Sequence, residues 1–210
     1  MKLFFSLTVV GILLASCASS RLIEQYANPE TTEFRPQKIL VVGLTPDGGL
    51  QREFEYSMVL ALENQNIKAE KSVDLYGEPF TINEDASGKL EISVSELRKA
   101  GFDAVIFSKI TGRERRVSLA QSYRNLASTL ETFDDYYNEN RSIHKSEDLE
   151  GYPVLITETS LYCLCPDKNN DLVWRGSIEV KNTQNSRELI RDYVNTLQKT
   201  LRKKGFFGRS

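Results

Sequence analysis

Two cysteines, Cys163 and Cys165, flank Leu164 and carry the most versatile chemistry in the body of this sequence. Thiols can form a disulfide, bind a metal ion or take part in redox reactions. Strand alternation would place both thiols on one face, although positions i and i+2 are normally too far apart and too constrained for an easy mutual disulfide. Packed thiols or a disulfide at the strand end are favoured over metal or redox chemistry. His144 is the only histidine, so a zinc site would lack ligands unless two protomers shared the ion.

A hydrolytic active site is not indicated. A Ser-His-acid triad would have to use His144, and no Gly-x-Ser-x-Gly elbow occurs. Acidic pairs such as Asp134-Asp135 lie in a polar stretch, where a solvated loop is the ordinary explanation. We therefore expect no catalytic residues, no cofactor and no resident metal, and the sequence predicts a protein that is not an enzyme.

The segment from Gly43 to Gly49 joins a predicted strand to a predicted helix, where free backbone amides can bind an anion. It has neither the Walker lysine and hydroxyl pair nor the spacing of a dinucleotide-binding loop. Asp47 would also repel a phosphate, so a turn is the favoured interpretation. Gly48 and Gly49 remain the candidate residues if the protein binds a small ligand.

Residues 111–152 are rich in charge, Asn, Ser and Tyr and interrupt the regular pattern of elements. They form either an insertion or an excursion that contains a helix over about 119–132. Aromatic and arginine side chains dominate interface hot spots, so this segment is a candidate partner-binding surface, with locally packed tyrosines as the alternative. The candidate residues are Arg113, Arg115, Arg116, Tyr123, Tyr136 and Tyr137.

The amino terminus has the features of a secretory signal. Lys2 precedes an apolar run from Leu3 to Leu14, which is too short for a membrane span of roughly twenty residues. The run ends in Leu14-Ala15-Ser16-Cys17, which resembles the lipobox of bacterial lipoproteins. That resemblance implies diacylglycerol transfer to the Cys17 thiol, cleavage before it, and acylation of the new amino terminus with a chain such as palmitate. The implied partner is a lipid bilayer.

The residues that follow Cys17 indicate which membrane of the envelope the lipoprotein would reach. In enteric lipoproteins an Asp at that place favours the inner membrane, whereas this sequence continues Ala18-Ser19-Ser20-Arg21. We expect a lipid-anchored protein on the periplasmic face of the outer membrane. The formal charge of −2 lacks the excess of cations that nucleic-acid binding needs, so a protein of the envelope is the expected partner.

The elements that must position these residues follow from hydrophobic periodicity. A buried strand is predicted over 38–44 and a helix after it, with Leu50, Phe54 and Met58 inward and Glu53, Glu55 and Glu63 between them. A second strand over 69–75, a short helix ending at Gly101 and a third strand over 103–110 follow. Strands over 154–163 and 172–180 form a hairpin, and a final amphipathic helix begins near Asn185 and ends at Gly205.

The predicted fold class is therefore α/β, with a mixed sheet in two or three layers and the order β-α-β-α-β, insertion, β-β-α. The domain boundaries are 1–16 for the signal peptide, 17–36 for a lipidated polar tether and 37–205 for a single domain with the insertion 111–152. Prolines in the tether discourage regular structure there.

Three strand motifs carry a wider resemblance. They are Ile39-Leu40-Val41-Val42-Gly43, Gly101-Phe102-Asp103-Ala104-Val105-Ile106 and Leu172-Val173-Trp174-Arg175-Gly176. Together with the lipobox they resemble envelope lipoproteins with a module like the amino-terminal part of TolB-type proteins, the curli-secretion lipoproteins and the lipoprotein activators of penicillin-binding proteins. The resemblance implies a non-enzymatic binding or envelope-assembly role and transfers no catalytic residue.

Overall fold

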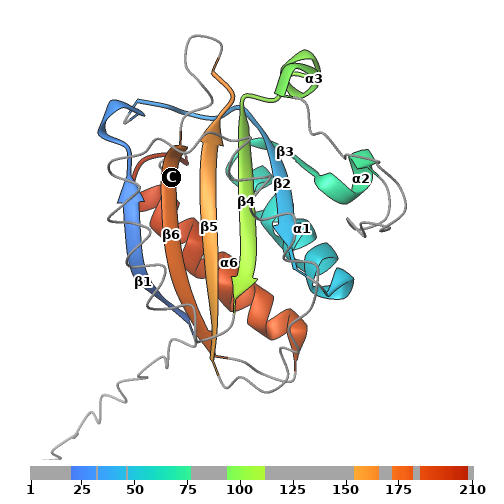
Figure 1. Cartoon of the computed structure of the whole chain (residues 1–210), viewed down its shortest axis with the longest axis vertical. Coiled ribbons are helices and arrows are strands. Elements are labelled where there is room, and N and C mark those ends of the chain that lie inside the picture. Colours follow the sequence, from blue (N-terminus) through green and yellow to red (C-terminus); the bar gives the residue numbers. More distant parts are fainter. Residues whose placement is uncertain are drawn as a thin grey trace, which may run out of the picture.

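One mixed sheet of six strands organises the described residues of the computed structural model, which are 20–31, 33–45, 47–76, 94–111, 154–165, 172–181 and 185–207. The strand order is β1-β6-β5-β4-β2-β3 (Figure 1). The strands are β1 (Ser20–Ala27), β2 (Lys38–Leu44), β3 (Lys68–Lys71), β4 (Ala104–Thr111), β5 (Val154–Cys163) and β6 (Leu172–Lys181). The helices are η1 (Pro29–Thr31), α1 (Gly48–Glu63), α2 (Ser72–Tyr76), α3 (Val94–Lys99) and α6 (Ser186–Lys203). The predicted α/β class is confirmed.

Parallel pairing is confined to one half of the sheet. Strand β2 pairs in parallel with β3 and with β4, because α1 carries the chain back along the sheet between β2 and β3. The remaining pairs, β4–β5, β5–β6 and β1–β6, are antiparallel. The predicted hairpin of β5 and β6 is confirmed.

Strand β1 was not predicted, and it contradicts the expectation that residues 17–36 form a polar tether. Residues 20–27 pair with β6 at the edge of the sheet, from Ser20 opposite Val180 to Ala27 opposite Trp174. Leu22 packs against the main core, and Asn28 ends the strand by donating its backbone N–H to the Val173 carbonyl at 2.9 Å. The prolines that suggested irregular chain lie beyond this strand. The folded domain therefore includes residues 20–27, which lie before the predicted boundary at residue 37.

The second predicted strand is shorter than expected. Strand β3 ends at Lys71, and residues 72–76 turn into α2, where Ser72 and Val73 both donate hydrogen bonds to the side chain of Glu55. That polar interaction draws the chain out of the sheet. Helix α3 ends before Gly101, whose φ of +84° suits a residue without a side chain.

The two faces of the sheet are covered differently. Helices α1 and α6 lie side by side on one face (Figure 1), where the main apolar core collects residues such as Met58, Trp174 and Leu197. On the other face, Leu97 of α3 and the adjoining Phe102 pack on the apolar residues of β2, β4 and β5. This second core sits toward the end of the sheet where α3 lies.

Helix α6 follows the prediction closely. Asn185 caps its start, because the side-chain oxygen accepts from the backbone N–H groups of Arg187 and Glu188 at 3.1 and 3.3 Å. All four members of the expected stripe are buried. They are Leu189, Tyr193, Leu197 and Leu201. Among the described helices, none combines the length and apolar character that crossing a membrane would require.

Candidate functional site

The expected lipidation residue and the expected partner-binding residues lie outside the described part of the chain. Cys17 precedes the first described residue, Ser20. The stretch 112–153 is also undescribed, and with it the partner-binding candidates. They are Arg113, Arg115, Arg116, Tyr123, Tyr136 and Tyr137. Both sets therefore stay predictions, and the described residues supply other candidates.

The glycine turn forms the start of α1 and is already satisfied by its neighbour. Gly48 is the first residue of the helix, and Asp47 is its cap. One carboxylate oxygen of Asp47 accepts from the backbone N–H of Gly49 at 2.7 Å and of Leu50 at 3.1 Å. An anion would have to displace this carboxylate to reach those amides. The geometry therefore favours the capped turn over a ligand site at Gly48 and Gly49.

The two cysteines form a disulfide at the end of β5. Their Cα atoms are 5.2 Å apart, within the range that a disulfide requires. Two residues of one extended strand would lie about 6.6 Å apart, which is why the spacing argued against an easy bond. Only Cys163 belongs to the strand, however, and Cys165 lies beyond its end, where the chain can turn back. The argument from strand spacing was wrong, and the alternative of a disulfide at the strand end is what the structure contains.

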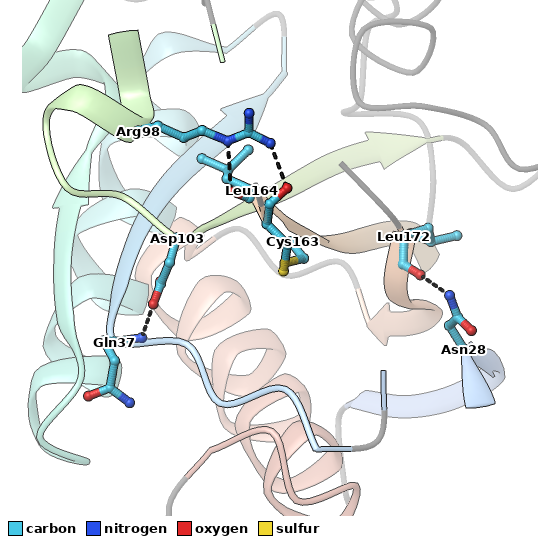
Figure 2. Close-up of a disulfide and its surroundings, with 8 residues drawn as sticks. Asn28, Gln37, Arg98, Asp103, Cys163, Leu164 and Leu172 are labelled. Atoms are coloured by element: carbon cyan, nitrogen blue, oxygen red, sulfur yellow. Dashed lines mark hydrogen bonds between the residues drawn. A yellow bond between two sulfur atoms is a disulfide. The ribbon is translucent and has the colours of Figure 1, made fainter. Parts of the chain in front are cut away.

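Arg98 of α3 holds the turn that this disulfide closes. Its guanidinium donates from Nε to the Leu164 carbonyl at 2.9 Å and from Nη2 to the Cys165 carbonyl at 2.6 Å (Figure 2). The Leu164 N–H donates in turn to the Asp103 carbonyl at 2.8 Å. Cys163 is buried, whereas Cys165 is partly exposed. Contacts from α3 and from Asp103, just before β4, thus support a short covalent ring at this end of the sheet.

Metal binding by these thiols is not favoured. Both sulfur atoms are engaged in the disulfide, and a metal ligand must be a free thiolate. Within the described ranges, no three histidine, cysteine, aspartate or glutamate side chains gather closely enough to hold a metal ion.

Replacing Arg98 with alanine is expected to make the disulfide easier to reduce. The variant loses two hydrogen bonds from a charged donor, which contribute about 1.5–3 kcal/mol each, and the turn will open more often. Timed exposure to a dithiol followed by thiol counting measures the rate. Lys99→Ala, on the same helix at an exposed position, is the matched control. An unchanged rate in the Arg98 variant would show that the turn is held without the guanidinium.

Charged side chains also lie buried on the sheet face opposite α1 and α6. Lys109 of β4 pairs with Glu158 of β5 at 3.0 Å, and their side chains are only 11% and 4% exposed. On β6, Arg175 donates to the Ser160 hydroxyl at 2.7 Å and to the Tyr162 hydroxyl at 2.8 Å. Removing either Lys109 or Glu158 would leave the other charge buried without its ion-pair partner. These contacts fix the register of three neighbouring strands, and we assign them a structural role.

Helix α1 carries an unusual distribution of polarity. Glu55 and Gln51 are completely buried, although the sequence pattern placed Glu55 among the outward residues. The Glu55 carboxylate accepts hydrogen bonds from β2 and α2, which pulls it inward. Tyr56 and Leu60, one helical turn apart, are instead 53% and 42% exposed. We call these two residues the α1 strip.

Burial raises the pKa of the Glu55 carboxyl above its ordinary value, and the hydrogen bonds from Gly43, Ser72, Gln51 and Val73 counteract part of that rise. All the hydrogen bonds that reach its two oxygens come from groups of the fold itself. The carboxyl is thus used to hold α1 against β2 and α2. We assign it a structural role.

No protein-family model matches the chain, and no curated protein matches it in sequence. Among solved structures, the chain is similar to the PelC dodecamer from Paraburkholderia phytofirmans, with 13% identity, a TM-score of 0.42, and 85% of this chain and 97% of that chain covered. It is also similar to the lipoprotein GNA1162 from Neisseria meningitidis, with 16% identity, a TM-score of 0.41, and 79% and 99% covered. Similarity at this level identifies no family. The expected kinship with TolB-type modules stays a prediction.

Proposed function

We propose that this chain is a lipoprotein of the bacterial cell envelope whose α/β domain binds a protein partner as a non-enzymatic accessory module. The lipobox at Cys17 supports the membrane anchor, and the residues after it favour the periplasmic face of the outer membrane. The observation that carries partner binding is the α1 strip. The modules of TolB-type and related lipoproteins, which the strand motifs resemble, imply a role of the same kind.

The α1 strip suits a protein interface because of what the rest of the helix does. A surface helix ordinarily buries one apolar stripe and exposes polar residues. Helix α1 already buries an apolar stripe that includes Phe54 and Met58, and on its exposed side it adds Tyr56 and Leu60. Tyrosine is enriched among the residues that dominate binding energy, because it combines a large apolar ring with a hydroxyl group. A partner that covers this strip would remove both side chains from water.

Helix α6 provides the internal comparison. It packs on the same face of the sheet beside α1, and its exposed positions include Asn195 and Lys199, again one helical turn apart. Neither is a large apolar residue, so α6 follows the ordinary distribution. The difference between the two neighbouring helices supports α1 as the proposed interface.

The proposal predicts that replacing both Tyr56 and Leu60 with serine will weaken partner capture at least tenfold, since a hot-spot residue contributes about 2 kcal/mol or more. The full lipidated chain serves as bait for chemical crosslinking and affinity capture from solubilised envelopes. Quantitative mass spectrometry compares the captured proteins and maps the crosslinked peptides on the bait.

A matched double variant, Asn195→Ser with Lys199→Ser, should capture the partner as the unmodified chain does. Circular dichroism and thermal unfolding must show that all three chains are equally folded. A captured set that is identical for the α1 and α6 variants would refute the α1 strip as the interface. A second bait without residues 112–153 tests whether the predicted arginines and tyrosines of that segment add to the same interface.

A further inference from the structure

We propose that the domain rests directly on the lipid bilayer, with the end of the sheet where β1 begins facing the phospholipid headgroups. This orientation depends on the proposed lipidation of Cys17. The sequence alone suggested a tether of about twenty residues, from which a domain could take any orientation. The structure places residues 20–27 of that tether in a strand of the sheet.

Few residues separate Cys17 from the first strand of the sheet. Ser20 is the third residue after Cys17, and three residues of fully extended chain span at most about 11 Å. A lipid inserted through Cys17 therefore holds Ser20 within that distance of the membrane surface. An ordinary flexible linker of twenty residues would instead allow an average separation of about 25 Å.

The attachment point is also fixed within the fold. Ser20 is only 8% exposed, and it lies opposite Val180 in the sheet. Its hydroxyl donates to the Asp192 carbonyl of α6 at 2.8 Å and shares a hydrogen bond of 2.6 Å with the Thr196 hydroxyl. The first strand is thus tied to both its neighbouring strand and a helix on the sheet. The orientation of the chain at Ser20 is therefore coupled to the orientation of the whole domain.

The strand register defines which parts of the molecule share this end. Strand β6 ends and β5 begins there, since Lys181 lies opposite Val154. Strand β4 also ends there, because Thr111 lies opposite Ile156. Helices α1 and α6 both begin toward this end, which is the lower end of the molecule in Figure 1. We call it the anchor end.

The anchor end exposes guanidinium groups that can contact phosphate headgroups, and it also exposes the carboxylates of Asp47 and Glu188. Arg21 pairs with Glu179, and the arginine side chain is 65% exposed against 19% for the glutamate. Arg187 lies 3.8 Å from Glu53, with exposures of 83% and 30%. In both pairs the guanidinium is the outer member, and Lys181, the last residue of β6, is also exposed. Guanidinium groups bind phosphate oxygens well, and exposed ion pairs hold them only weakly.

The opposite end of the sheet would then point away from the bilayer. It carries α3 and the turn closed by Cys163 and Cys165, and it lies about 30 Å from the anchor end along strands of ten residues. The α1 strip lies along the side of the domain between these ends. A protein partner can reach both regions without displacing lipid.

Photocrosslinking to lipid tests this orientation in the full lipidated chain, reconstituted in vesicles of phosphatidylethanolamine and phosphatidylglycerol. Benzoylphenylalanine replaces Lys181 at the anchor end in one variant and Lys99 of α3 in another; both lysines are exposed. We expect several-fold more lipid adducts at position 181 than at position 99. Inserting a glycine-serine segment of about twenty residues between Ala18 and Ser19 should bring the two yields together.

The same segment added after Ser210 is the matched control and should leave the difference intact. Equal yields in the original chain, or a higher yield at position 99, would overturn the orientation. If the difference in adduct yield between positions 181 and 99 survived the insertion, the short connection between Cys17 and Ser20 would not be its cause. Mass spectrometry of the amino-terminal peptide separates these outcomes from failure of the proposed function, since a Cys17 without lipid would refute the anchor itself.

Discussion

Replacing Glu55 with alanine is expected to destabilise the domain by roughly 2–4 kcal/mol, because several buried hydrogen-bond donors lose their acceptor at once. One carboxylate oxygen accepts from the Gly43 N–H at 2.9 Å, from the Gln51 amide at 3.0 Å and from the Ser72 hydroxyl at 2.7 Å. The other accepts from the Val73 N–H at 3.1 Å. Alanine leaves these groups buried and unsatisfied. Urea unfolding of the full chain measures the loss.

Two controls separate this effect from an ordinary helix substitution. Glu63→Ala changes an exposed glutamate of the same helix and should alter the free energy of unfolding by less than about 0.5 kcal/mol. Glu55→Gln keeps the shape and one acceptor oxygen and should cost less than alanine. A Glu55→Ala loss as small as that of Glu63→Ala would mean that water replaces the carboxylate without cost.

The pH dependence of this carboxyl has a defined sign. Burial raises the pKa of Glu55 in the folded chain above 4.5, its ordinary value. As pH rises above 4.5, the unfolded chain releases the proton before the folded chain does, so the free energy of unfolding decreases until the folded pKa is passed. Glu55→Gln lacks this titration. The stability of the unmodified chain relative to Glu55→Gln should therefore fall over that window, and a pH-independent difference would contradict the buried carboxyl.

The sequence predicted the elements whose patterns are strong and local. The apolar run of β2, the hairpin of β5 and β6, and the stripe and caps of α6 all lie where periodicity and turn residues placed them. In each case seven or more consecutive residues follow one pattern: the strands are buried along nearly their whole length, and α6 buries a single apolar stripe.

Strand β1 escaped prediction because its stability comes from residues far along the chain. Its apolar residues are few, and Leu22, Ile23 and Tyr26 do not alternate regularly along the chain. The strand forms because the edge of β6 offers unpaired backbone groups, and the pairing of Ser20 with Val180 joins segments 160 residues apart. A local pattern of eight residues contains no information about such an edge.

The candidate sites were harder to predict for a similar reason. The carboxylate of Glu55 is buried because the end of β2 and the start of α2 present donors to it, and neither fact is visible in the spacing of α1. The disulfide depended on where β5 ends, and a difference of two residues decides whether Cys165 belongs to the strand. Exposure of Tyr56 and Leu60 likewise depends on how α1 is rotated over the sheet.

A chain without Cys17, exported by a cleavable signal that needs no lipid transfer, is expected to leave the membrane fraction almost completely. Each methylene of an inserted acyl chain contributes about 0.8 kcal/mol, so two or more chains hold a protein stably and their removal lowers the affinity by many powers of ten. The arginines of the anchor end, partly neutralised by Glu179 and Glu53, contribute only a weak, salt-sensitive attraction.

Fractionation of cells that produce the two chains, followed by immunoblotting of washed membranes, measures the effect. The double variant Cys163→Ser with Cys165→Ser is the matched control, since it also removes thiols but leaves Cys17, and it should stay in the membrane pellet. A chain without Cys17, exported in this way, that remains bound after a high-salt wash would contradict lipid anchoring. Because Ser20 is tied to α6 by its own hydroxyl, the released chain should keep β1 in the sheet and unfold at the same urea concentration. The two measurements together separate loss of the anchor from loss of the fold.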